Sequence, residues 1–197
     1  MKLLKFLALG CPLFLLAYTF SVKAAEPEAG SLERGSRIVT SMDAKIGPEG
    51  SLTKVILREH PEDDGLLDLV LQNSELGTLQ SRKLIYALDR DEEDVSSYGV
   101  SVKQMPNGSF SVSAVKDWGT SVWSNRYVIS FRNGDFLLSG YDYEFSYREK
   151  SGKCSLNLLK GDALVNGRHR EISAAKISLE NADGLDLLKT CQELLAK

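Results

Sequence analysis

The chain has 197 residues, of which 24 are basic and 27 acidic, so its formal net charge is −3. A chain of this length fits one domain and can enclose a hydrophobic core. The acidic balance argues against a nucleic-acid-binding protein and gives no basic patch for docking on an anionic membrane.

The first 24 residues form a predicted secretory signal peptide, cleaved after Ala24. A basic start precedes an apolar run over residues 6–20, and small residues stand before the cut. The run is shorter than the ~20 residues of a membrane-spanning helix, and it continues past Cys11, where a lipid-attachment signal would end. We therefore expect a periplasmic or secreted protein. Cleavage removes three lysines and no acid, which leaves 21 basic and 27 acidic residues and a net charge of −6.

Residues 25–51 are rich in Glu, Gly and Ser and show no sustained periodicity. We expect them to form a flexible leader, with at most a short element over residues 37–42. From Leu52 onward, short apolar runs are separated by turn residues. This pattern predicts a single β-rich domain over residues 52–197.

A candidate calcium loop begins at His60, between the first two predicted strands. Polar groups stand at relative positions 1, 3, 5 and 9, with Gly65 at position 6: His60, Glu62, Asp64 and Asp68. Calcium loops use this spacing because alternate residues point toward a hard cation and Gly permits the sharp turn. The candidate ligands are Glu62, Asp64 and Asp68, since a neutral imidazole is a poor calcium ligand. The alternative is a plain acidic turn that binds no ion.

This spacing resembles the loop of integrin-type FG-GAP and VCBS repeats, which likewise runs into a Leu-Val-Leu strand. The chain departs from that pattern at His60, where an Asp is expected, and at Glu62, which is longer than the usual Asp or Asn.

More broadly, residues 52–165 resemble an uncharacterised family of secreted bacterial β-rich proteins, which open with such a loop and continue with hairpins. The segments that carry this likeness are 98–102, 119–123, 131–141 and 155–161. The family carries no assigned enzymatic activity, so the resemblance implies the fold and the secreted location only.

An acidic run over residues 89–94 follows the third predicted strand. Such a run is usually a solvated loop, and the alternative is an electrostatic docking site for a basic partner. The candidate partner-binding residues are four acids of this run and both tryptophans: Asp89, Asp91, Glu92, Asp94, Trp118 and Trp123.

Strands and tight turns alternate regularly from Tyr98 to Leu179. Apolar residues alternate with polar ones, and turn dipeptides separate the runs at Asn107-Gly108, Asn133-Gly134, Ser151-Gly152 and Asn166-Gly167. This predicts a mainly β protein, in which antiparallel hairpins or a meander form a sheet or a small sandwich.

An alternating aromatic row lies within one of these predicted strands: Tyr141, Tyr143, Phe145 and Tyr147. The simpler interpretation places the row in the core, since a half-buried strand buries every second residue. The alternative is an exposed aromatic shelf that, helped by the two tryptophans, binds a sugar ring or a protein.

Two cysteines remain after cleavage. In an oxidising compartment, Cys154 and Cys191 are predicted to form one disulfide. Cys191 lies on the apolar face of one C-terminal helix, predicted over residues 183–196 with Asp183 as its N-cap. The disulfide is therefore expected to hold this helix against the sheet.

The sequence contains no recognisable catalytic pattern. It has two histidines, His60 and His169, and lacks the nucleophile elbow, the zinc-protease helix and the phosphate-binding glycine loop. We therefore expect a protein that is not an enzyme and has no cofactor, with calcium as the one candidate ion. The favoured function is protein binding, as an inhibitor or an immunity protein against an envelope-targeting toxin. The alternative is an envelope glycan-binding or calcium-stabilised accessory module.

Overall fold

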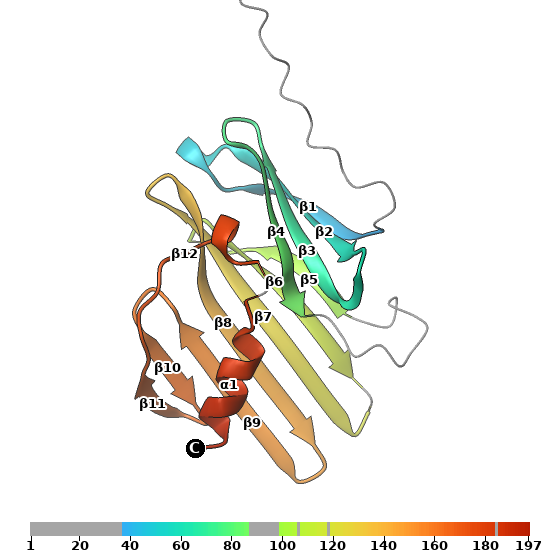
Figure 1. Cartoon of the computed structure of the whole chain (residues 1–197), viewed down its shortest axis with the longest axis vertical. Coiled ribbons are helices and arrows are strands. Elements are labelled where there is room, and N and C mark those ends of the chain that lie inside the picture. The colour runs from blue at the N-terminus through green and yellow to red at the C-terminus, as the bar shows by residue number, and fades with distance from the viewer. Residues whose placement is uncertain (1–36, 87–98, 106, 118, 184) are drawn as a thin grey trace, which may run out of the picture.

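The computed structural model describes residues 37–86, 99–105, 107–117, 119–183 and 185–197, without the side chains of residues 63–65. Over these ranges the chain is mainly β, with two antiparallel sheets and one C-terminal α-helix, which confirms the predicted fold class (Figure 1). Several predictions fall outside the described residues: the signal peptide 1–24, the acids Asp89, Asp91, Glu92 and Asp94, and Trp118.

The smaller sheet is an antiparallel meander in the order β1-β2-β3-β4. Its strands are β1 (Ile38–Lys45), β2 (Leu52–His60), β3 (Asp63–Asn73) and β4 (Gly77–Tyr86), and the 3-10 helix η1 (Pro48–Gly50) joins the first two. β1 pairs with β2 along its length. The strand covers the short element expected over residues 37–42 and extends to Lys45, so residues 43–51 are more ordered than the predicted flexible segment. An edge strand is held by its backbone ladder to one neighbour, so it needs few apolar side chains.

The larger sheet is also a meander, in the order β11-β10-β9-β8-β7-β6-β5. Its strands are β5 (Gly99–Gln104), β6 (Ser109–Asp117), β7 (Ser121–Arg132), β8 (Asp135–Tyr147), β9 (Lys150–Asn157), β10 (Asp162–Val165) and β11 (Arg168–Glu171). The short strand β12 (Ile177–Ser178) pairs with β8 and leads into the 3-10 helix η3 (Leu179–Asn181).

Three of the predicted turn dipeptides lie between successive strands of this sheet: Asn107-Gly108, Asn133-Gly134 and Asn166-Gly167. In the last two, both residues have positive φ, as a type I′ hairpin requires. Asn and Gly adopt this conformation more readily than other residues. Local turn chemistry therefore sets where these strands end.

The fourth predicted turn, Ser151-Gly152, is misplaced. The chain turns at Arg148-Glu149, and Gly152 lies inside β9. A Cβ at Gly152 would stand 2.4 Å from a ring carbon of Phe145 and 3.1 Å from a methyl carbon of Leu195. Glycine is needed here for the close approach of an aromatic ring and the C-terminal helix, which is a tertiary requirement.

The hydrophobic core lies on one face of the larger sheet, where both the smaller sheet and α1 (Leu187–Leu195) pack (Figure 1). Along β8, Tyr141 and Tyr143 are buried in this core, whereas Tyr147 at the strand end is half exposed. The aromatic row is therefore mainly core and does not form an exposed shelf. Burial raises the pKa of the Tyr141 and Tyr143 phenols, so both remain neutral at physiological pH.

The helix begins later than predicted. Asp186 is its N-cap, and its carboxylate accepts a hydrogen bond from the Lys189 backbone N at 2.8 Å. The predicted cap, Asp183, instead accepts a hydrogen bond from the backbone N of Arg82 in β4 at 2.6 Å. Asp183 therefore ties the C-terminal segment to the smaller sheet.

The predicted disulfide is present. It joins Cys154 in β9 to Cys191 in the middle of α1, with a Cα–Cα distance of 5.7 Å. Both cysteines are fully buried. The helix is thus bonded covalently to the sheet that it covers.

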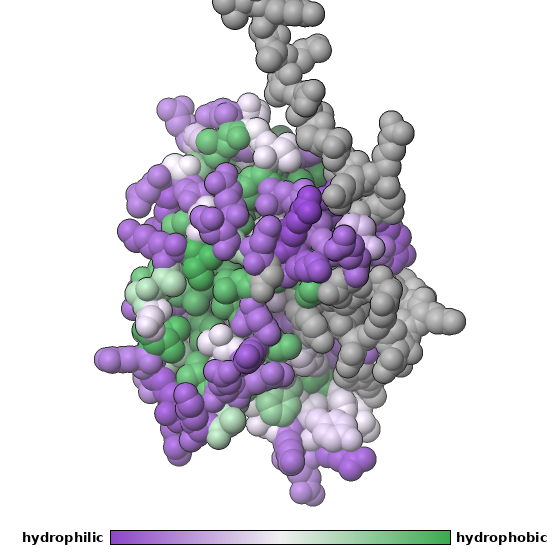
Figure 2. All heavy atoms as spheres, viewed as in Figure 1, coloured by the Kyte–Doolittle hydropathy of each residue, from purple (hydrophilic) through white to green (hydrophobic). Residues whose placement is uncertain are grey.

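Figure 2 shows the face of the molecule that carries α1. Polar residues cover much of this face, and apolar residues gather between α1 and the smaller sheet. The segment between β11 and α1 contributes Ile172, Ile177 and Leu185, which are partly buried against the core. No helix in the described part of the chain is long and apolar enough to cross a membrane.

Candidate ligand-binding groove

The candidate calcium loop is a tight hairpin in the structure. Only Pro61 and Glu62 lie between β2 and β3, because strand pairing resumes at Asp63. Glu62 is exposed at the turn, whereas Asp68 lies inside β3 and is fully buried. Asp64 also belongs to β3. Among the described residues, no group of three His, Cys, Asp or Glu side chains could hold a metal ion.

Asp68 is instead the centre of a buried polar cluster on the smaller sheet. Its Oδ1 accepts a hydrogen bond from Lys83 N at 3.0 Å and lies 2.8 Å from His60 Nδ1. Its Oδ2 lies 3.3 Å from Gln80 Nε2 and 3.5 Å from Arg58 Nε. A bulge at the left-handed Lys83 (φ 52°) turns that backbone N–H toward the carboxylate. The cluster is a structural unit, because Asp68 has no exposed surface.

Of the predicted partner-binding residues, only Trp123 lies in the described part of the chain. It is partly buried in β7 and packs edge-on against Tyr143, with ring centroids 6.4 Å apart. Its indole therefore packs partly against the core, and its role in partner binding stays a prediction. The acidic run and Trp118 stay predictions.

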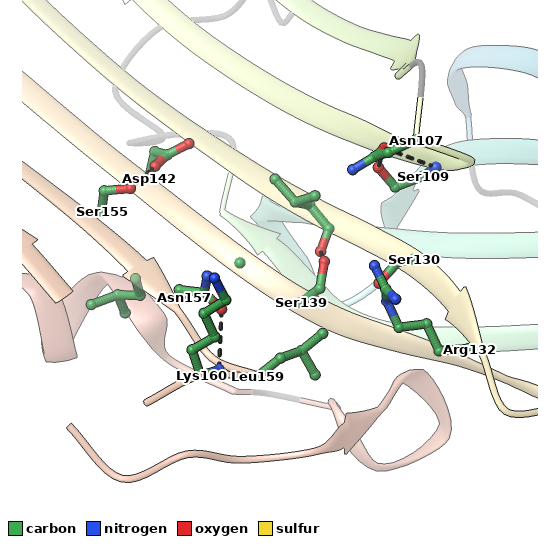
Figure 3. A pocket seen from close by; sticks show the side chains of 13 residues that line it. Asn107, Ser109, Ser130, Arg132, Ser139, Asp142, Ser155, Asn157, Leu159 and Lys160 are labelled. Atoms are coloured by element: carbon green, nitrogen blue, oxygen red, sulfur yellow. Dashed lines mark hydrogen bonds between the residues drawn. The ribbon is translucent and has the colours of Figure 1, made fainter. Parts of the chain in front are cut away.

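An open groove with both polar and apolar lining residues crosses the face of the larger sheet that points away from the core (Figure 3). Its volume is about 490 Å³, within the range of small-ligand sites. The floor comes from outward-facing residues of β6 to β9, which alternate with core residues along each strand. The floor carries four serine hydroxyls, Ser109, Ser130, Ser139 and Ser155, beside the apolar side chains of Val128 and Leu156.

A β-bulge in β8 contributes to the hollow in the sheet surface. The ladder between β7 and β8 shifts after Val128, and Ser139 is the extra residue. Ser139 Oγ donates a hydrogen bond to Val128 O at 3.0 Å. The next residue, Gly140, has no side chain, and a Cβ there would stand 3.1 Å from Leu156 O. The bulge and the glycine together leave the hollow.

A turn after β9 positions Lys160 in the wall of the groove. Asn157 Oδ1 accepts a hydrogen bond from Lys160 N at 3.1 Å, and Asn157 O accepts one from Gly161 N at 2.9 Å. The Gly161 carbonyl then accepts a hydrogen bond from Ile172 N at 3.0 Å. The turn is thus held from both sides.

Replacing Gly161 with alanine is expected to destabilise the protein by roughly 1–3 kcal/mol. Gly161 has φ 71°, and a Cβ there would stand 2.7 Å from Ile172 O and 2.8 Å from Ala174 N. Urea denaturation followed by tryptophan fluorescence measures the change. Gly167→Ala is the matched control, because Gly167 has φ 79° and nothing within 4 Å of an added Cβ. Equal losses in both variants would show that the contacts around Gly161 contribute nothing.

Ser130 lines the groove with a hydroxyl that has no hydrogen-bond partner in the described structure. The residue is 6% exposed. An unpaired buried hydroxyl costs about 1–3 kcal/mol, and it can be satisfied by a ligand atom. Ser130 and Arg132 share one face of β7, because they are two residues apart on a strand. In Figure 3 the Arg132 side chain reaches toward Ser130.

Replacing Ser130 with alanine is expected to leave stability unchanged or to raise it by up to about 1 kcal/mol, because the change removes an unpaired polar group. Thermal denaturation of the ligand-free protein measures this. Ser109→Ala is the control, because Ser109 is also buried but donates a hydrogen bond to Asn107 Oδ1. That variant should lose about 0.5–1.5 kcal/mol. A greater loss in Ser130→Ala than in Ser109→Ala would contradict the assignment.

The groove carries positive charge. Arg132 and Lys160 are exposed, and neither forms an ion pair with another residue of the described chain. The acid in the lining, Asp142, is paired with Arg126, whose Nη2 lies 2.5 Å from Oδ2, and Asp142 also accepts a hydrogen bond from Ser155 Oγ. Among the described residues, two cations thus remain uncompensated, although the whole chain has a net charge of −3. The local potential favours a negatively charged ligand.

The groove could not be predicted from the sequence, although one signal is present there. Ser109, Ser111 and Ser113 alternate with apolar residues, which places a row of small hydroxyls on the outer face of β6. Serine is too common in turns and exposed strands for this row alone to mark a site. The hollow also requires the bulge at Ser139, which has no sequence signature.

No protein-family model matches this chain, and no curated protein or solved structure matches it significantly. The resemblance to FG-GAP and VCBS repeats therefore stays a prediction from the sequence.

Proposed function

We propose that this protein is a non-catalytic binding domain and that it binds a saccharide in the groove of the larger sheet. The observation that carries the proposal is the lining: four serine hydroxyls and two asparagine amides line a hollow of about 490 Å³, and the Ser130 hydroxyl there has no partner in the described structure. A ligand rich in hydroxyl groups suits this lining, because each hydroxyl both donates and accepts hydrogen bonds.

The chemistry of the lining favours binding over catalysis. None of the described residues that line the groove is His or Cys, and the Asp142 carboxylate is engaged by Arg126 and Ser155. A general base or an activated nucleophile needs a group whose proton or electron pair is available to the substrate.

A periplasmic or secreted location is part of the proposal. The Cys154–Cys191 disulfide supports it, because such bonds persist in oxidising compartments and are rare in the cytosol. This location agrees with the predicted signal peptide and makes envelope or extracellular glycans the natural ligands. The alternative function, an inhibitor or immunity protein, depends on the acidic run over residues 89–94 and stays a prediction.

Titrating the ¹⁵N-labelled protein with a panel of neutral and charged oligosaccharides tests the proposal, because NMR detects weak binding and locates it. The expected result is a set of shifted amide signals at Ser130, Ser139, Gly140 and Asn157. Gly140→Val should abolish the shifts, since its side chain fills the hollow. Gly99→Val, a change in β5 away from the groove, is the control. No shifts, or shifts confined to another surface, would refute the proposal.

A further inference from the structure

We infer that the saccharide carries an anionic group, a carboxylate or a phosphate, which binds at Arg132 and Ser130 while Lys160 adds a second positive charge. This inference rests on the proposed function. It names the class of saccharide that the groove selects, which the hydroxyl-rich lining alone does not decide.

The positions of the two cations support this class of ligand. In Figure 3, Lys160 and Arg132 lie on either side of Ser139, so a ligand in the hollow meets one cation on each side. The guanidinium of Arg132 can donate two parallel hydrogen bonds to a carboxylate or phosphate, and charge-assisted bonds are about twice as strong as neutral ones. The nearby Ser130 hydroxyl can donate a further bond to the same group.

The composition of the lining also disfavours a neutral sugar. An aromatic side chain offers a sugar ring a large apolar contact area, but no aromatic residue lines the groove within the part of the chain that the structure describes. The aromatic residues of the same strands, such as Tyr127 in β7 and Tyr141 in β8, are buried on the opposite face. Without a stacking ring, polar contacts must supply a larger share of the affinity, and an anionic group makes the strongest of these.

The test compares ligands that differ in charge. The full protein is titrated with trigalacturonate, with maltotriose as the neutral counterpart of equal length, and with glucose 6-phosphate and glucose as a second pair. We expect each anionic ligand to bind about tenfold or more tightly than its neutral counterpart at low salt, with weaker binding as salt increases. The relative affinities of the two anions show whether carboxylate or phosphate is preferred.

Variants locate the effect. Arg132→Gln should weaken binding of the anionic ligand about tenfold and leave binding of the neutral ligand unchanged. Arg168→Gln makes the same charge change on the exposed strand β11 and should have no effect. Equal losses in both variants would mean non-specific attraction and would overturn the inference.

The outcomes separate the inference from the proposed function. Equal binding of neutral and anionic ligands in the groove overturns the inference and leaves the proposed function standing. The absence of binding by every saccharide overturns both.

Discussion

Replacing Asp68 with asparagine is expected to lower the free energy of unfolding by about 3–5 kcal/mol, because the change leaves a buried charge uncompensated. The guanidinium of Arg58 lies 3.5 Å from the Asp68 carboxylate, and the two side chains are 3% and 0% exposed. Asparagine keeps an oxygen that can accept the hydrogen bond from Lys83 N, but it has no charge to balance Arg58. Urea denaturation at neutral pH measures the loss.

Two further variants identify the cause of this loss. Glu59→Gln removes the acid of an exposed ion pair with Arg37, and such pairs contribute at most about 1 kcal/mol. The double variant Arg58→Met/Asp68→Asn removes both buried charges and should be more stable than Asp68→Asn alone. If it is no more stable, the lost hydrogen bonds carry the effect and the unpaired charge does not.

Removing the disulfide by replacing Cys154 and Cys191 with alanine is expected to cost about 4 kcal/mol. The bond closes a loop with a sequence separation of 37 residues, and its loss enlarges the conformational freedom of the unfolded chain. The loss should also destabilise α1 locally, because its nine residues are fewer than the ~12–15 that an isolated helix needs to be stable in water. Chemical denaturation measures the free energy of unfolding, and hydrogen exchange of the Leu188 to Leu194 amides measures the local stability of the helix.

The same experiment has an internal control. A reductant should destabilise the natural protein by a similar amount and should have no effect on the alanine variant. Unchanged exchange protection of α1 after reduction would show that the packing of Leu187 and its neighbours holds the helix without the covalent bond.

The arrangement gives the larger sheet two different faces. One face is covered by the smaller sheet and by α1, and it includes the buried aromatic residues Tyr127 and Tyr141. The opposite face carries the groove with Ser130 and Gly140. Because the groove rests on strands rather than on long loops, its residues are held rigidly, which reduces the ordering cost of binding.

The features that could be predicted from the sequence are those that depend on residues close together in the chain. The alternation of apolar and polar side chains and the Asn-Gly turns predicted antiparallel strands, and the structure confirms them at Asn133-Gly134 and Asn166-Gly167. The disulfide and the C-terminal helix were also predictable, since Cys191 repeats with leucines at helical spacing. Each of these features depends on backbone preferences over a few residues or on counting cysteines.

Tertiary structure decided the rest. Asp68 has the spacing of a calcium ligand, yet pairing of β2 with β3 buries it beside Arg58. Gly152 has the look of a turn residue, yet it makes room for Phe145 and α1. The groove combines residues from four strands and two turns with a bulge at Ser139. Burial, charge pairing and hollows depend on which distant segments meet, and hydrophobic alternation specifies which face of a strand is inward but not what the outward residues approach.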